Sequence, residues 1–343
     1  MRARLAPLRR LVAAAAIAAA TFLSGIGPGL AQSPLLERMA VDARPISHFR
    51  IGSTETRFGP LEFVGGLSMA SGGRNFGALS AFRFLSPGSE FMGVADTGFF
   101  YFGRIERDAA GAPAGIADFR MMPMVDAAGQ PIVGKVDLDA EGLDVHEGTV
   151  TVSFERDHRI AEFELRPDDM RAPLRNLDFI VPRNELRQNR GFETVARAPS
   201  DSPLAGARVA VTERSIDRDG NIFAAILEGP RRGVFKVARL GDYDVTDGAF
   251  LPDGDLLLLE RRFSIATGVG MRIRRIGADT IRPGGLADGP VLIEANMAFQ
   301  IDNMEGLDVW RRQDGALMVS IVSDDNHSIL QRNLYLEFRL LPD

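Results

Sequence analysis

The chain has 343 residues, a net charge of −6 and no cysteine. The lack of cysteine excludes disulfides, thiolate nucleophiles and cysteine-ligated metals. The acidic balance, without any basic run, argues against a nucleic-acid partner, because a negative surface repels phosphate backbones.

The first 31 residues predict a secretory signal peptide. Four arginines precede an uncharged apolar run over 11–23, and Gly29-Leu30-Ala31 suits a small-residue cleavage pattern. The run of about 13 apolar residues falls short of the ~20 that span a bilayer, so we expect no membrane span after processing. The remaining chain keeps 36 basic and 46 acidic groups, a net charge of −10. We expect a periplasmic or secreted bacterial protein, exported by the Sec or the twin-arginine route.

After the signal, residues 32–45 predict a linker and residues 46–343 one all-β domain. Val150, Val152 and Phe154 alternate with polar residues, and a period of two is typical of half-buried strands. Sequences such as Asp219-Gly220-Asn221 supply the backbone angles of tight turns between such strands.

A unit recurs five times along this domain, from a glycine in a short apolar strand to carboxylates at the end of the following strand. The glycines stand at positions 66, 142, 191, 248 and 306, at intervals of 76, 49, 57 and 58 residues. Repeats of about 50 residues with uneven loops are typical of a β-propeller built from four-stranded blades. We expect six blades, with five or seven as alternatives, because the longest interval has room for an unmarked blade. A strand near residues 47–51 is expected to close the ring.

The two clearest copies of the unit cover residues 141–156 and 305–326. Two antiparallel strands joined by a short turn bring the start of the first and the end of the second together. We therefore expect three groups of carboxylates at one mouth of the central channel: Glu141 with Glu155, Glu305 with Asp324 and Asp325, and Asp247 with Glu260.

Carboxylates held this close raise one another's pKa unless positive charges lie among them. A cation such as Ca²⁺ is one solution, since it takes about six to eight oxygen ligands, and neighbouring arginines are the other. For the three Glu-Arg copies at 155–156, 213–214 and 260–261 we favour structural ion pairs. The polar run Asp324-Asp325-Asn326-His327, which follows an apolar strand, is the best candidate site.

Other motifs are weaker. The four histidines show no zinc-site spacing, and no Gly-x-Ser-x-Gly nucleophile motif is present. Asp217, Asp219 and Asn221 resemble the start of a calcium loop, but the glutamate at the twelfth position is missing. We interpret them as a hairpin turn.

Several of these residues together resemble the phytase-like family, exported bacterial proteins described as having esterase-like activity. The resemblance lies in Gly-Gly-Leu-Ser at 65–68, Glu-Gly-Leu at 141–143 and 305–307, Gly-Phe-Glu at 191–193, and the closing pattern Ser-Asp-Asp-Asn-x₄-Gln-Arg-x₅-Phe at 323–338. It implies a β-propeller related to the calcium-dependent propeller phytases, with a hydrolase activity. Those phytases bind their anionic substrate with several lysines, whereas this chain has only Lys135 and Lys236. This departure argues against phytate itself.

The leading hypothesis is a monomeric, periplasmic, metal-assisted hydrolase of a small-molecule phosphoester or carboxylic ester. The cation, most simply Ca²⁺, would be held by Glu141, Glu155, Glu305, Asp324, Asp325 and Asn326. His327, Arg156 or Arg332 would stabilise developing negative charge. Two alternatives remain open: a non-catalytic propeller that binds a partner or ligand, and a lactonase-like propeller with one divalent ion in its channel.

Overall fold

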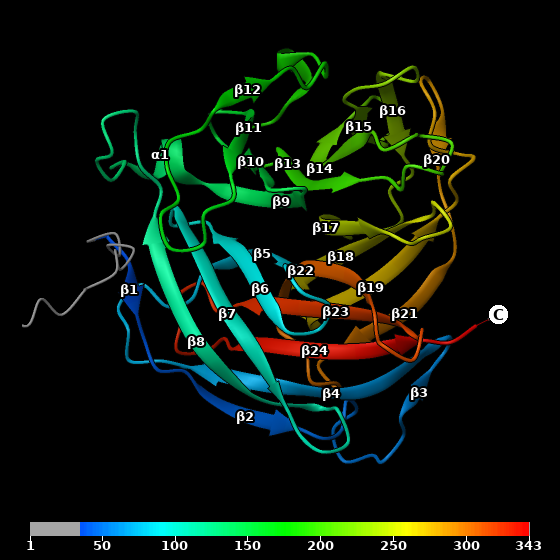
Figure 1. Cartoon of the computed structure of the whole chain (residues 1–343). Helices are drawn as coiled ribbons and strands as arrows, with labels where there is room; N and C mark the ends of the chain where they lie inside the picture. The colour runs from blue at the N-terminus through cyan, green and yellow to red at the C-terminus, as the bar shows by residue number, and fades with distance from the viewer. Residues whose placement is uncertain (1–34, 343) are drawn as a thin grey trace, which may run out of the picture. The chain divides into compact units, whose positions relative to one another are not determined.

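Five separate β-sheets surround a central axis in the computed structural model, which describes residues 35–342 (Figure 1). The predicted signal peptide, residues 1–31, lies outside the described residues. The described residues form one compact unit, a five-bladed β-propeller. The expected all-β propeller is therefore confirmed, with five blades, one of the two alternative counts, in place of six.

The first two blades come from residues before the middle of the chain. In the order from the central axis outward, the first blade contains β5 (Leu79–Phe84), β6 (Glu90–Ala95), β7 (Phe99–Arg107), β8 (Pro113–Pro123) and β1 (Glu37–Arg38). The second contains β9 (Ala140–His146), β10 (Thr149–Phe154), β11 (Arg159–Glu164) and β12 (Arg175–Leu177). A single-turn helix, α1 (Lys135–Leu138), precedes the second blade, and a 3₁₀ turn, η1 (Arg183–Glu185), follows it.

The third and fourth blades are built in the same way. The third contains β13 (Phe192–Arg197), β14 (Arg208–Ile216), β15 (Ile222–Ile226), β16 (Gly233–Val237) and the short parallel strand β20 (Leu286–Ala287). The fourth contains β17 (Asp244–Phe250), β18 (Leu256–Ser264), β19 (Gly268–Ile276) and β21 (Val291–Asn296).

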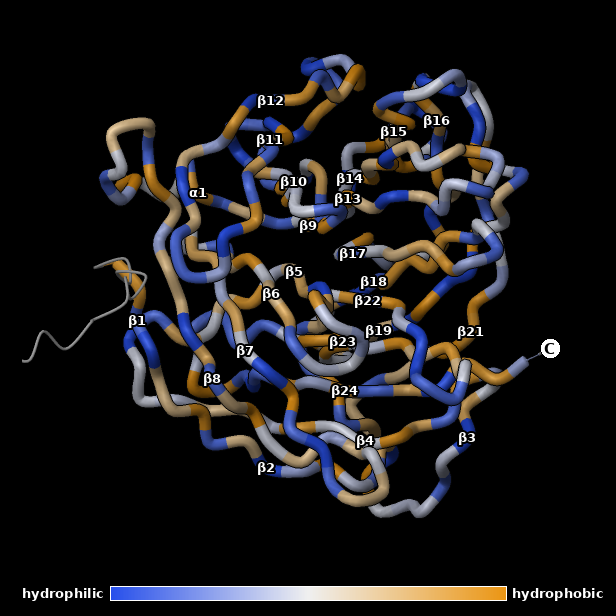
Figure 2. The backbone as a smooth tube through the Cα atoms, viewed as in Figure 1, coloured by the Kyte–Doolittle hydropathy of each residue, from blue (hydrophilic) through white to orange (hydrophobic). Residues whose placement is uncertain are grey.

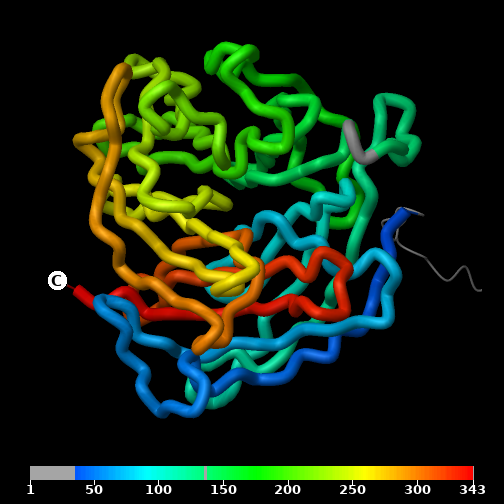
Figure 3. The backbone as a smooth tube through the Cα atoms, turned by 180° about the vertical axis from the view of Figure 1, so that it is seen from behind, coloured from blue at the N-terminus to red at the C-terminus, as the bar shows by residue number. Residues whose placement is uncertain are grey.

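The fifth blade joins the two ends of the domain. It contains β22 (Asn303–Arg311), β23 (Leu317–Asp324), β24 (Asn333–Leu340), β4 (Leu61–Ala70) and β2 (Asp42–Ile46), with β3 (Arg57–Phe58) paired to β4. Figures 1 and 3 both show β24 (red) beside β4 (blue), so one blade is closed by the early and the late chain together. This closure leaves no free edge between the first and last blades.

Three expectations about the early chain are corrected by this closure. The strand that pairs with the C-terminal strand is β4, and not residues 47–51. Gly66 lies in β4, well away from the axis, so the first copy of the repeat does not mark an innermost strand and the blade count falls to five. Residues 37–38 and 42–46 form β1 and β2, paired with β8 and β4, where a linker was expected.

The hydrophobic core lies between neighbouring blades. Consecutive apolar residues in β18 and β23, visible in Figure 2, are buried on both faces of their sheets, as the fully buried Leu257, Leu258 and Ile321 show.

No helix in the described part of the chain has the length and apolar character needed to cross a membrane.

A buried arginine fills the middle of the channel. Arg83 of β5 binds both carboxylate oxygens of Asp247 (2.7 and 2.9 Å) and donates to the carbonyls of Leu307 (2.6 Å) and Val195 (3.4 Å). These partners belong to β17, β22 and β13, so one guanidinium joins four blades. The ion pair between Arg83 and Asp247 therefore separates one end of the channel from the other.

Candidate functional site

Each innermost strand carries one extra residue near its start, which interrupts the regular pairing with the second strand of the blade. Such a β-bulge re-aims the side chain of the extra residue. The pairing registers place the five bulge residues at equivalent positions around the axis: Ser80, Glu141, Glu193, Thr246 and Glu305.

A second set of five equivalent positions follows from the same registers. In each blade the residue before the bulge pairs with a residue of the second strand, and the position of interest is the one directly after that partner. These residues are Asp96, Glu155, Glu213, Arg261 and Asp324. The two sets meet at one mouth of the channel, so this mouth carries mainly carboxylates.

The mouth contains a cavity of about 210 Å³. Eight acidic side chains and three arginines line it, together with Ser80, Asn189 and Asn326. The acids are Asp96, Asp139, Glu141, Glu155, Glu193, Glu213, Glu305 and Asp324, and the arginines are Arg156, Arg190 and Arg261. Carboxyl groups therefore outnumber guanidinium groups in this cavity by eight to three.

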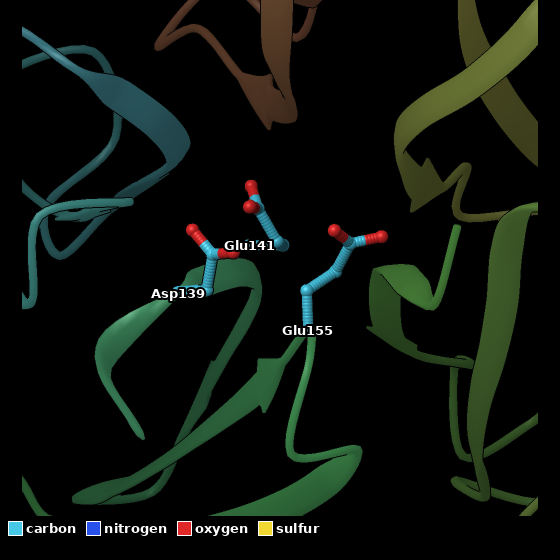
Figure 4. A group of neighbouring side chains, drawn as sticks. All are labelled: Asp139, Glu141 and Glu155. Atoms are coloured by element: carbon cyan, nitrogen blue, oxygen red, sulfur yellow. The ribbon is translucent and has the colours of Figure 1, made fainter. Parts of the chain in front are cut away.

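Two groups of three carboxylates in this cavity are close enough to share a cation. In the first, oxygens of Asp139, Glu141 and Glu155 lie within 4.8 Å of one another, and Figure 4 shows these side chains directed to the same space, two from the start of β9 and one from the end of β10. The second consists of Glu155, Glu193 and Glu213. Glu155 belongs to both groups, so a cation in either position would use it.

Some of these acids already have partners. Arg156 donates to Asp139 (2.5 Å), Arg190 to Glu213 (2.7 Å), and the backbone N–H of Gly191 to Glu155 (2.6 Å). Glu193 differs: it is only 7% exposed, lines the cavity, and has no hydrogen bond or ion pair to any residue that the structure describes. A buried carboxylate without a partner is costly unless a cation or a proton neutralises it.

The electrostatic consequence is a set of carboxyl groups that hold protons unusually strongly. Burial, with the charges of neighbouring acids, raises the pKa of Glu155 to about 7 and of Glu305 to about 8. For the same reasons the pKa of Asp324 rises to about 7, and those of Glu141 and Glu193 rise well above the usual value of 4.5. Like charges that cannot all ionise together are typical of functional sites.

The structure brings most of the predicted site residues to this cavity. Glu141 lies beside Glu155 and Glu305 shares the cavity with Asp324, as strand direction predicted, and Asn326 and Arg156 also line it. Glu213 also lines the cavity, although we expected it to form a structural ion pair with Arg214.

Three predicted residues lie elsewhere. Asp325 accepts hydrogen bonds from the backbone N–H groups of Ala78 (3.4 Å) and His327 (3.1 Å), so it shapes the loop instead of facing the cavity. His327 is exposed on this loop. Arg332 is held outside by Gln300 (2.9 Å) and by Asp302 (3.5 Å). The long polar loop after β23 turns these side chains away from the axis.

The expected pairing of Asp247 with Glu260 is also wrong. Asp247 binds Arg83 in the channel, and Glu260 forms ion pairs with Arg272 and Arg274 inside the fourth blade. The pairing registers explain the error. Arg261 is the residue of the fourth blade that is equivalent to Glu213 of the third, and Glu260 precedes it by one residue. A shift of one residue moves a strand side chain to the opposite face.

The cavity also contains residues that were not predicted from the sequence, among them Asp139, Glu193, Arg190 and Asn189. Glu193 had a usable signal, because it belongs to the Gly-Phe-Glu motif at 191–193, next to a repeat glycine. Asp139 precedes its strand and has no counterpart in the repeats, so only the structure reveals it.

The comparisons with known proteins support a family but no specific activity. A search of curated proteins finds no match. The endo-arabinase from Bacteroides thetaiotaomicron VPI-5482 is similar at 12% identity, over 74% of this chain and 90% of that chain, with a TM-score of 0.44. The PQQ-bound aldose sugar dehydrogenase from Streptomyces coelicolor is similar at 13% identity, over 83% of this chain and 99% of that chain, with a TM-score of 0.45.

At these TM-scores neither likeness carries information on the activity. The family model "Phytase-like: Esterase-like activity of phytase" matches residues 74–327, a range that contains all five innermost strands and the whole acidic mouth. The resemblance seen in the sequence is thereby confirmed, and the chain belongs to the Phytase-like family.

Proposed function

We propose that the protein is a periplasmic hydrolase that uses a divalent cation, most simply Ca²⁺, to cleave a phosphoester or a carboxylic ester. The observation that carries the proposal is the cavity itself, where eight carboxylates face three guanidinium groups and Glu193 has no partner among the described residues. The periplasmic location rests on the N-terminal arginines and the apolar run at 11–23.

The donor set fits a hard cation. All the candidate ligands are carboxylate or amide oxygens, without histidine or cysteine, as Ca²⁺ prefers. Asp139, Glu141 and Glu155 would hold the ion, because their oxygens already converge. A cation held here would polarise an ester oxygen and lower the pKa of a water molecule.

The surrounding side chains supply the remaining chemistry. Glu305 and Asp324, with pKa values of about 8 and about 7, hold or release a proton near neutral pH, as a general acid or base must. Arg156 and Arg190 line the same cavity and place positive charge where negative charge would develop on a substrate. The cavity of about 210 Å³ admits the reacting group of a substrate, while the bulk of the molecule would remain outside.

The test is metal analysis of the purified protein, followed by assays with phosphomonoester, phosphodiester, carboxylic ester and lactone substrates at varied Ca²⁺. We expect bound cation, and hydrolysis that disappears after chelation and returns with Ca²⁺. Glu155→Gln should lose both properties, whereas Glu164→Gln, an exposed glutamate of the same blade, should retain them.

Each class of result has a clear meaning. Cation binding without turnover of any substrate would favour the non-catalytic binding protein, and turnover of lactones alone would favour the lactonase-like alternative. An active protein that is indifferent to chelation and to Glu155→Gln would contradict the proposal.

A further inference from the structure

Arg261 stands alone among the five equivalent positions at the ends of the second strands. The other four blades place an acid there, namely Asp96, Glu155, Glu213 and Asp324. The propeller therefore offers five similar positions around one mouth, and a single blade supplies a permanent positive charge.

The guanidinium of Arg261 lies between acids of two neighbouring blades. Its Nε is 3.2 Å from an oxygen of Glu305, and its Nη2 is 3.7 Å from an oxygen of Glu213. Nε forms no hydrogen bond of proper geometry with a described residue, and the side chain is 30% exposed. Arg261 is thus held by charge between several carboxylates, much as a metal ion would be, and not by one directed ion pair.

The two groups of carboxylates differ in how much positive charge they already have. Glu213, in the group with Glu155 and Glu193, faces both Arg190 and Arg261. On the other side Arg156 binds Asp139, while the carboxylate of Glu141 has no hydrogen bond or ion pair with a described residue and feels the charge of Arg261 only at longer range. The group formed by Asp139, Glu141 and Glu155 is therefore the one left open to a cation.

We propose that Arg261 takes the place of a second cation, so that the centre binds a single divalent ion at Asp139, Glu141 and Glu155. Loss of the Arg261 charge would then open a second cation site at Glu155, Glu193 and Glu213. The buried, unpartnered Glu193 supports this, because its carboxylate is already directed into the cavity. This inference rests on the cation binding in the proposed function.

The experiment measures the number of bound ions, independently of activity. Chelator-treated protein is titrated with CaCl₂ by calorimetry, and its calcium content is measured after dialysis against Ca²⁺. We expect one equivalent for the unmodified protein and two for Arg261→Met and Arg261→Gln. Arg261→Lys, which keeps the charge, should bind one. Arg214→Met should also bind one, because Arg214 pairs with Asp244 outside the cavity.

A second readout guards against a variant that folds poorly. Arg261→Met and Arg261→Gln should melt at a lower temperature than the unmodified protein without Ca²⁺ and gain more from its addition, because the ion replaces the lost charge. One equivalent in every variant, or two in the unmodified protein, would overturn the role of Arg261. No bound calcium in any of them would instead remove the proposed function.

Discussion

At the scale of single residues, Glu155 is the centre of the acidic mouth, because it belongs to both groups of three carboxylates that are close enough to share a cation. The repeats allowed about half of this centre to be predicted. Glu141, Glu155, Glu305 and Asp324 could be assigned from strand direction alone, because antiparallel neighbours end at the same face. The arginine that follows a glutamate was a poor guide to its partner, since Glu213 forms ion pairs with Arg190 and Arg261 and not with Arg214. Whether an acid faces the channel or the inside of its blade depends on the bulge, and the sequence does not reveal it.

Glu193 gives the sharpest test of electrostatic strain at one residue. With Ca²⁺ removed at pH 8, Glu193→Gln should stabilise the protein by about 1–3 kcal/mol, the usual cost of an unsatisfied buried polar group. At pH 5 the gain should vanish, because the raised pKa keeps Glu193 protonated there. Urea unfolding at the two pH values measures it, with Glu164→Gln as control. A destabilised Glu193→Gln at pH 8 would show that this carboxylate has a partner after all.

The stability of the cation-free protein should fall as the pH rises. An acid whose pKa is higher in the folded state binds a proton more strongly there, so protonation favours folding. The contribution is fully present below the usual value of 4.5 and is lost as the pH passes the folded values of about 7 for Glu155 and about 8 for Glu305. Melting temperatures measured in chelator from pH 5 to 8.5 should decrease, and Ca²⁺ should restore them at the upper end. A flat profile in chelator would contradict the clustering of these acids.

At the scale of strands, the alternation of apolar and polar residues predicted the strands well but their pairing register poorly. The turn at 146–149 and the strands around it are where alternation placed them. The extra residue in every inner strand was invisible, because a bulge needs a partner strand to be defined. Two of the repeat glycines, Gly142 and Gly306, directly follow the extra residue, and there the innermost strand of a neighbouring blade approaches closely.

Gly142 shows most clearly why a residue without a side chain is needed next to the bulge. A Cβ at this position would lie 2.5 Å from the carbonyl oxygen of Glu193 and 2.9 Å from the backbone nitrogen of Val195, both in β13. Gly142→Ala should therefore separate the second and third blades at the acidic mouth, lower stability by about 1–3 kcal/mol and weaken Ca²⁺ binding. Gly72→Ala is the control, because nothing lies within 4 Å of its added Cβ. Equal unfolding midpoints and calcium affinities for the two variants would refute the strand contact.

At the scale of the whole molecule, the class of fold could be predicted but not the number of blades. The interval of 76 residues before Gly142 does contain a blade that no repeat glycine marks, β5 to β8, but Gly66 lies in the same blade as Gly306, so the total is five. Closure of the ring through β4 joins residues more than 260 positions apart, such as Leu61 and Leu340. No local pattern carries that information.

The channel ion pair should hold the blades together. Arg83→Met leaves the fully buried Asp247 without its partner, and breaking a buried pair in this way costs about 3–5 kcal/mol. Urea denaturation should show this loss, and the double variant Arg83→Met, Asp247→Asn should recover part of it because the unpaired charge is gone. If the double variant were no more stable than the single one, the charge of Asp247 would not be the cause.

The central claim is that the acidic mouth is a cation centre organised around Glu155. Its most direct test is a calorimetric titration of chelator-treated protein lacking residues 1–31 with CaCl₂, beside Glu155→Gln and Glu164→Gln. We expect one saturable site in the unmodified protein and in Glu164→Gln, and at least tenfold weaker binding in Glu155→Gln. Equal calcium affinity in all three proteins, or no saturable binding in any, would contradict it.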